Sequence, residues 1–125
     1  MTLMAQAVPS ATRLPCVSNL PYGWGVGIAE TIGGYALFGV GVGVGDGSGE
    51  DVIVSLTGSC PPPVEGTEHV PIEGGCVTYR SAVDEPGVPT FEPGGGLSLV
   101  DRADLVAAVA RDDQVLCGAS APACP

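Results

Sequence analysis

The sequence has no lysine, and four arginines are its only permanently cationic side chains against fourteen carboxylates. Without lysine, the chain can neither form a Schiff base nor supply the lysine of a phosphate-binding P-loop. The formal net charge of -10 repels nucleic-acid phosphates and anionic lipid headgroups. We therefore expect no nucleic acid among the partners of this protein.

Several catalytic and cofactor-binding motifs are also missing. No G-x-G-x-x-G can be read in the glycine-rich stretch 38–49, because Asp46 and Ser48 stand where the last glycine would be needed. No G-x-S-x-G nucleophile elbow is present, and His69 is the only histidine that could act as a general base. We expect no cofactor and name no catalytic residue, and we keep a hydrolase dependent on His69 as an alternative.

The sequence contains no apolar run long enough to cross a membrane. Residues 31–45 carry no charge, but this glycine-rich stretch falls short of the ~20 residues that a membrane helix needs. Near the N-terminus, Ala5-Gln6-Ala7 matches the small-x-small pattern that signal peptidase recognises, without a basic region before it. Two interpretations stay open, namely an export signal that begins upstream of Met1 and a coincidence in an alanine-rich segment.

Cysteine is abundant for so short a chain. The five cysteines are Cys16, Cys60, Cys76, Cys117 and Cys124. Such a density is typical of an oxidising compartment. There is no C-x-x-C pair, so a metal site would need the unorthodox set of Cys60, His69 and Cys76, and we expect no metal.

The cysteine spacing suggests two disulfides and one remaining thiol. A Cys60–Cys76 bond would close a hairpin-like loop of about 15 residues, which stabilises a fold by roughly 3 kcal/mol in the chain-entropy model. For the second bond, Cys16 with Cys117 and Cys117 with Cys124 both remain open, and we slightly favour the first because it would tie the two ends of the chain together.

Glycine alternates with large apolar residues in "YGWGVGI" (22–28) and in "FGVGVGVG" (38–45). A period of two places the large side chains on one face of a strand and the glycines on the other. A helix would lose about 1 kcal/mol for each interior glycine. We therefore predict strands. Of two interpretations of the glycine face, we favour one that admits a helix or a second sheet at close range over one that marks a flat strand of poorly specified register.

The segment "GDGSGED" that follows has the composition of a hairpin turn leading into a strand at 51–57. The same turn offers carboxylates to a weak calcium site, which is a second interpretation. Its ligands would be Asp46, Ser48, Glu50 and Asp51. Two positions of the calcium-loop pattern are wrong, since Asp51 replaces the invariant glycine and Thr57 replaces the final glutamate.

The rest of the chain is predicted to hold a proline-rich loop at 60–76, a strand at 76–83, an acidic loop at 84–96 and a short strand at 114–117. Asp101 is the expected N-cap of a helix that ends at Arg111. The fold class is mainly β (β-rich α+β), an antiparallel sheet or small sandwich with one helix in the C-terminal region. A single domain at 14–125 follows a flexible segment at 1–13.

Three segments carry a resemblance to a known group of proteins. "LPCVSNLPYGW" (14–24), "VSLTGSC" (54–60) and "GGCVTYR" (74–80) resemble, in this order, segments of small extracytoplasmic domains from uncharacterised actinobacterial secreted and membrane-anchored proteins. The resemblance implies a location outside the membrane and an anchor elsewhere in related chains. It implies no activity.

These observations together favour a non-catalytic extracytoplasmic domain that recognises or senses a partner at the cell envelope. The expected binding surface is the cystine-braced, proline-rich loop, because a rigid segment loses little entropy on binding. Its candidate residues are Pro61, Pro62, Pro63, His69 and Pro71. The expected partner is an envelope or extracellular protein. A small secreted protease inhibitor that presents residues 61–75 is the alternative, and a loop that serves only as a connector is the simplest interpretation.

Overall fold

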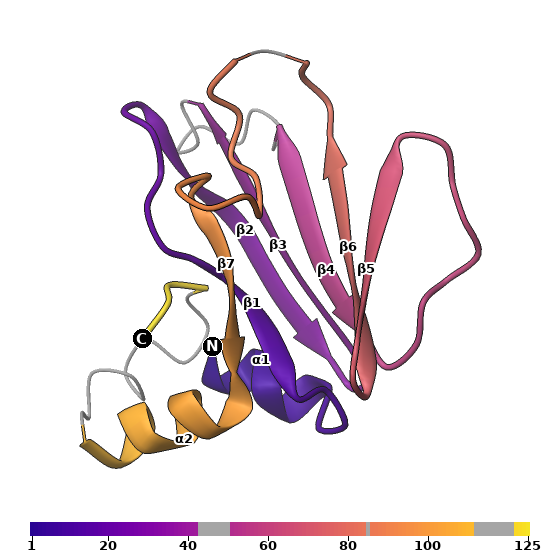
Figure 1. The fold of residues 1–125 in the computed structure, drawn as a ribbon, viewed down its shortest axis with the longest axis vertical. Helices are drawn as coiled ribbons and strands as arrows, with labels where there is room; N and C mark the ends of the chain where they lie inside the picture. The colour runs from indigo at the N-terminus through magenta and orange to yellow at the C-terminus, as the bar shows by residue number, and fades with distance from the viewer. Residues whose placement is uncertain (43–50, 85, 112–121) are drawn as a thin grey trace.

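The computed structural model describes residues 1–42, 51–84, 86–111 and 122–125 (Figure 1). Its elements in chain order are α1 (Thr2–Ala7), β1 (Arg13–Val17), β2 (Trp24–Ile32), β3 (Tyr35–Val42), β4 (Val52–Thr57), β5 (Thr67–Ile72), β6 (Gly75–Ser81), β7 (Leu97–Asp101) and α2 (Arg102–Arg111). The mainly β fold class with antiparallel sheets and a helix in the C-terminal region is confirmed.

Five strands form one antiparallel sheet in the order β2-β3-β4-β6-β5. The alternation of apolar residues decides which face of this sheet is buried. Phe38 and Val40 of β3 stand opposite Val54 and Val52 of β4, and all four side chains are fully buried. This face therefore supplies one wall of the hydrophobic core.

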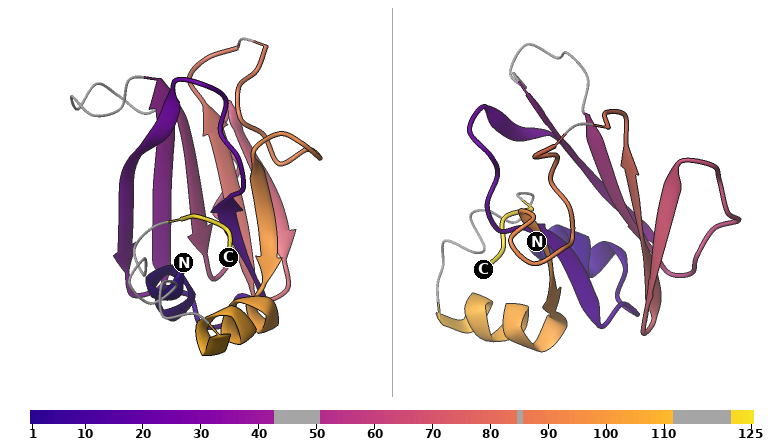
Figure 2. Two further views of the ribbon diagram at one scale, coloured as in Figure 1. Left: turned by 90° about the vertical axis from the view of Figure 1, so that its left-hand side faces the viewer. Right: turned by 45° about the horizontal axis from the view of Figure 1, so that its top comes forward.

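A second layer covers the core face of the sheet. It consists of the antiparallel pair β1–β7 together with α1, as Figures 1 and 2 show. Leu14 of β1, Leu97 of β7 and Met4 of α1 belong to the same buried cluster as Phe38. The two layers form a small, unequal sandwich around one core.

The glycines of β3 alternate with side chains of the core. Gly39 and Gly41 lie between Phe38, Val40 and Val42 along the strand, and both glycines are buried. The close approach of a helix or second sheet to the glycine face stays a prediction.

The N-terminal residues are part of the core. Residues 1–13 were expected to be a flexible segment, but this segment contains α1 and the buried side chains of Met1, Met4 and Val8. The backbone N–H of Gly34, in the β2–β3 turn, donates to the carbonyl oxygen of Ala7 at 2.6 Å. The helix is thereby fastened to the large sheet.

The segment between α1 and β1 holds the β5–β6 hairpin in place. Ser10 Oγ donates to the Gly74 carbonyl at 2.7 Å, and the N–H and hydroxyl of Thr12 both donate to the Glu73 carbonyl at 3.0 Å. Gly74 has a φ of 76°, and a Cβ at this position would overlap the Ser10 carbonyl oxygen. Glycine at the turn thus permits the close approach that fixes the edge of the sheet.

Most predicted elements that fall on described residues are present. The predicted strands at 22–28, 51–57 and 76–83 match β2, β4 and β6 approximately, and the predicted helix matches α2. The predicted loop at 60–76 was wrong in part, because β5 pairs with β6 inside it. The predicted turn at 45–51, apart from Asp51, and the predicted strand at 114–117 lie outside the described residues.

Candidate functional site

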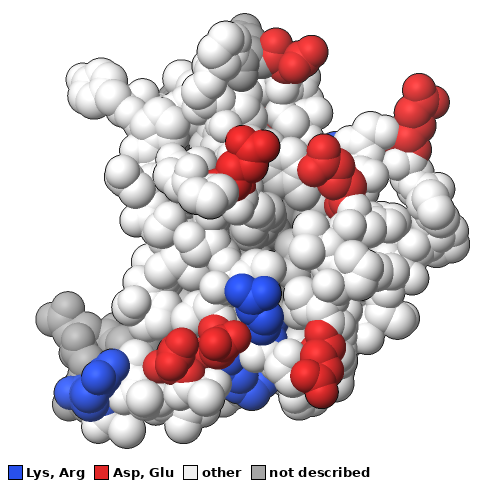
Figure 3. Space-filling view, in the orientation of Figure 1, with Lys and Arg blue, Asp and Glu red and all other residues white. Residues whose placement is uncertain are grey.

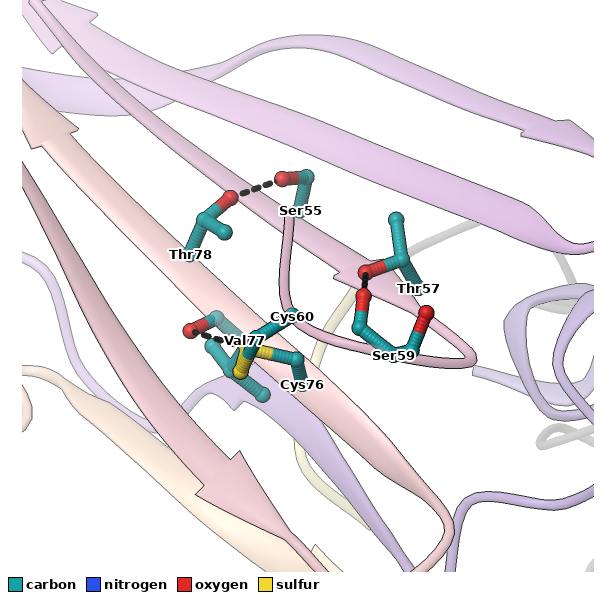
Figure 4. Close-up of a disulfide and its surroundings, with 7 residues drawn as sticks. All are labelled: Ser55, Thr57, Ser59, Cys60, Cys76, Val77 and Thr78. Atoms are coloured by element: carbon teal, nitrogen blue, oxygen red, sulfur yellow. Dashed lines mark hydrogen bonds between the residues drawn. A yellow bond between two sulfur atoms is a disulfide. The ribbon is translucent and has the colours of Figure 1, made fainter. Parts of the chain in front are cut away.

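The Cys60–Cys76 disulfide ties the segment after β4 onto the sheet (Figure 4). Its S–S distance is 2.04 Å and the sequence separation is 16. Cys76 lies on β6 and is fully buried, whereas Cys60 is exposed. This bond confirms the first predicted pairing.

The second disulfide joins Cys16 to Cys124 and not to Cys117. The Cys117 pairings, with Cys16 or with Cys124, were therefore wrong, and Cys117 itself lies outside the described residues. Backbone contacts explain the outcome. The Val17 N–H donates to the Pro122 carbonyl at 2.7 Å and the Cys124 N–H donates to the Val17 carbonyl at 2.9 Å, which places the two Cα atoms of the cystine 5.0 Å apart.

The predicted binding loop divides into an exposed segment and a strand. Pro61, Pro62 and Pro63 are all exposed, and Val64 has 63% of its surface accessible. Pro71 belongs to β5, an edge strand, where a missing N–H need not cost a ladder hydrogen bond. The freely presented part of the loop is therefore residues 61–66, directly after the disulfide.

His69 is separated from the exposed prolines and lies on β5. It stands opposite Thr78 of β6, which in turn stands opposite Ser55 of β4. The hydroxyl groups of Ser55 and Thr78 contact each other, as Figure 4 shows. Thr78 thus lies between Ser55 and His69 across the three strands, so Ser55 is not directly beside the imidazole.

Neither metal set considered from the sequence is assembled among the described residues. The sulfur atoms of Cys60 and Cys76 are bonded to each other, so the set containing His69 is wrong. Asp51 uses a carboxylate oxygen to accept a hydrogen bond from the Val42 N–H at 3.2 Å. The other three residues of the calcium alternative lie outside the described residues. The described part of the chain has no group of three or more His, Cys, Asp or Glu residues placed to hold a metal ion.

A groove that the sequence did not predict lies between β5, β6 and the loop that follows β6. Its volume is about 690 Å³. The lining residues are Glu68, Val70, Tyr79, Ser81, Val83, Asp84, Gly87, Val88, Thr90, Phe91 and Glu92. Only the acidic character of residues 84–96 hinted at it, because the partners on β5 and β6 are brought there by the fold.

The charge of this groove is one-sided. Among the described residues that line it, three are acidic and none is basic. Figure 3 shows acidic groups beside a hollow in the upper half of the face, while most of the visible arginine surface is in the lower half. Burial raises the pKa of Tyr79 above its usual value of 10.0, the hydrogen bond with Ser81 lowers it, and the nearby charge of Glu68 raises it further.

No protein-family model, no curated protein and no solved structure matches this chain. No helix within the described residues is both long and apolar enough to span a bilayer.

Proposed function

We propose that this chain is a non-catalytic extracytoplasmic domain that recognises a protein partner at the cell envelope. The observation that carries the proposal is the Cys60–Cys76 disulfide, which fastens an exposed, proline-rich segment to a rigid sheet. Its binding residues are Pro61, Pro62 and Pro63 together with Val64.

The cellular location follows from the sulfur chemistry. Two disulfides are formed, and such bonds persist in oxidising compartments outside the cytoplasm. Secretion and attachment to the envelope are the finer parts of the proposal.

The presented segment loses little conformational entropy when it binds a partner. Each proline has its φ angle fixed near -65°, and the disulfide fixes one end of the segment. Binding therefore immobilises few additional degrees of freedom, which preserves more of the contact energy as affinity. The exposed Val64 adds an apolar contact at the centre of the segment.

A protease inhibitor remains the second candidate, because exposed Val64 follows a disulfide-anchored segment. The strand β5 shortens the presented segment from 61–75 to residues 61–66. A panel of serine proteases separates the candidates. Tight inhibition that disappears on reduction would favour the inhibitor, and the recognition domain is expected to inhibit none of them.

The recognition function is tested by photocrosslinking in the source cells. A benzophenone amino acid replaces Val64 in one variant and Val106 of α2 in the matched control, because these side chains are 63% and 62% exposed. We expect a discrete adduct in the envelope fraction from position 64 alone. Loss of that adduct when Cys60 and Cys76 are both changed to serine would link recognition to the fastened loop. Equal adducts from both positions, or none from position 64, would contradict the proposal.

A further inference from the structure

The floor of the groove beside β5 is suited to a long cationic side chain. The rings of Tyr79 and Phe91 meet edge to face, with centroids 6.2 Å apart and an interplanar angle of 71°. Val70 and Val88 lie beside them in the lining. Aromatic faces attract arginine and lysine cations, and apolar neighbours pack the methylene stems of these side chains.

The rim supplies negative charge from three separate segments. Glu68 comes from β5, Asp84 follows β6, and Glu92 belongs to the loop, and all three are exposed. Arg80 stands between Tyr79 and Ser81 on β6, so strand alternation directs it to the opposite face. No arginine among the described lining residues therefore neutralises the negative charge of the rim.

The carboxylates surround the groove and do not converge on one point. They are not part of any metal-binding cluster among the described residues. An extended organic cation, which can contact several separated oxygens and a hydrophobic floor at once, fits this arrangement better than a compact ion.

The groove is held in shape by hydrogen bonds of its own loop. Tyr79 Oη donates to the Pro89 carbonyl at 2.7 Å, and Ser81 Oγ donates to the Val83 carbonyl at 2.6 Å. Beyond Pro89, the Thr90 N–H donates to the Gly95 carbonyl at 2.8 Å. A site preformed in this way loses little entropy when a ligand enters.

We propose that this groove binds an arginine or lysine side chain presented by a basic segment of a partner protein. The charge complementarity follows from the net charge of -10 and from the absence of any basic residue in the groove lining. The proposal rests on the recognition function proposed above and adds the chemical class of the partner. It concerns a surface separate from residues 61–66.

The test uses the purified, oxidised full chain and synthetic peptides at low ionic strength. The probe is a fluorescein-labelled Gly/Ser peptide with a short run of arginines, and the control peptide carries citrulline, which is neutral and nearly isosteric, at the same positions. We expect saturable binding of the arginine peptide and of its lysine counterpart, and at least about tenfold weaker binding of the citrulline peptide, since charged pairs across an interface contribute on this scale.

Two variants with the same change in net charge distinguish the groove from the general acidity of the protein. The rim variant combines Glu68→Gln, Asp84→Asn and Glu92→Gln, and the control variant combines Glu30→Gln, Glu73→Gln and Asp104→Asn. We expect affinity for the arginine peptide to fall about tenfold in the rim variant and less than about twofold in the control. Phe91→Leu should weaken binding about threefold through loss of the aromatic floor.

Amide chemical shifts of the unaltered protein give a readout that does not depend on any variant folding. Perturbations centred on Val70, Tyr79 and Phe91 would support the proposal. Equal binding of the citrulline peptide, equal losses in the rim and control variants, or perturbations centred elsewhere would overturn it. Because purified protein and synthetic peptides are used, this proposal can fail while crosslinking at position 64 succeeds, and the reverse outcome is equally distinguishable.

Discussion

The Nη2 atom of Arg102 donates a hydrogen bond of 2.7 Å to the carbonyl oxygen of Val8, across 94 positions of the sequence. The same guanidinium also donates to the carbonyl oxygens of Ala11 at 2.7 Å and Ala5 at 3.1 Å. The carbonyl groups at the end of α1 have no partners within the helix. Arg102, at the start of α2, therefore donates hydrogen bonds to carbonyl oxygens at and just beyond the end of α1, and so connects the two helices.

The first prediction concerns this arginine. Arg102→Lys keeps the charge but loses the planar fork that reaches three acceptors. We expect the free energy of unfolding to fall by roughly 2–3 kcal/mol in denaturant titration, because hydrogen bonds to charged groups contribute about 1.5–3 kcal/mol each and are not additive. Arg111→Lys, at the exposed end of α2, is the control and should change stability by less than about 0.5 kcal/mol. Similar losses in both variants would contradict the joining role of Arg102.

The second prediction concerns the cystine connectivity. Peptide mapping without reduction should recover Cys16 linked to Cys124 and Cys60 linked to Cys76. In the chain-entropy model, removing the longer-range bond costs about 5 kcal/mol and removing the shorter one about 3 kcal/mol. Serine replacement of each pair, followed by thermal and denaturant unfolding, measures the two losses. A peptide linking Cys117 to either Cys16 or Cys124 would disprove this pairing.

The third prediction compares two turn glycines. Gly74 and Gly66 have similar φ angles of 76° and 81°, but only a Cβ at Gly74 meets the Ser10 backbone, while Gly66 has open space. Both alanine variants carry a left-handed backbone cost of about 1–2 kcal/mol. Gly74→Ala should lose at least about 1 kcal/mol more than Gly66→Ala, because overpacking adds to the backbone cost. Equal losses would show that the hairpin does not depend on contact with Ser10.

The fourth prediction concerns alkaline pH. Burial raises the pKa of Tyr79 above 10.0 in the folded chain, so the fold favours the neutral phenol. The resulting stabilisation is fully present below pH 10 and is lost as pH rises through the folded pKa. Tyr79→Phe should cost about 1 kcal/mol near neutral pH through loss of the hydrogen bond to Pro89.

The difference in stability between the unaltered chain and Tyr79→Phe should therefore narrow above pH 10. Urea unfolding at a series of pH values measures it directly. Tyr35 also has a pKa raised by burial and by the charge of Glu30, so Tyr35→Phe provides a comparison at a different site. A difference for Tyr79→Phe that stays constant through the alkaline range would contradict the assignment.

Local sequence patterns predicted the elements in which neighbouring residues all favour the same secondary structure. The alternation of glycine with apolar residues in β2 and β3 and the expected N-cap of α2 each point to a single structure. The Cys60–Cys76 bond was predictable for a similar reason, since the two cysteines flank one hairpin-like segment. A short separation in sequence keeps two cysteines close together, so each has few other cysteines with which to form a disulfide.

The missed features depend on residues that are distant in sequence. The composition of β5 resembles a loop because it contains Pro71, and only pairing with β6 makes it an edge strand. α1 contains six residues, too few for a stable isolated helix, and it depends on burial against the sheet and on Arg102. The Cys16–Cys124 bond was not predicted from the sequence. Backbone hydrogen bonds with Val17 bring Cys124 next to Cys16, and no local pattern indicates them.

The sequence by itself determined the β-rich class, the presence of disulfides and the strong negative charge. Composition sets the charge and the number of cysteines, and a period of two favours a strand through neighbouring residues alone. Tertiary structure alone decided which segments cover the buried face of the sheet, where the second cystine closes, and that carboxylates from three segments surround the Tyr79–Phe91 floor. Those outcomes depend on which distant segments bury apolar area against one another, and no local pattern encodes that choice.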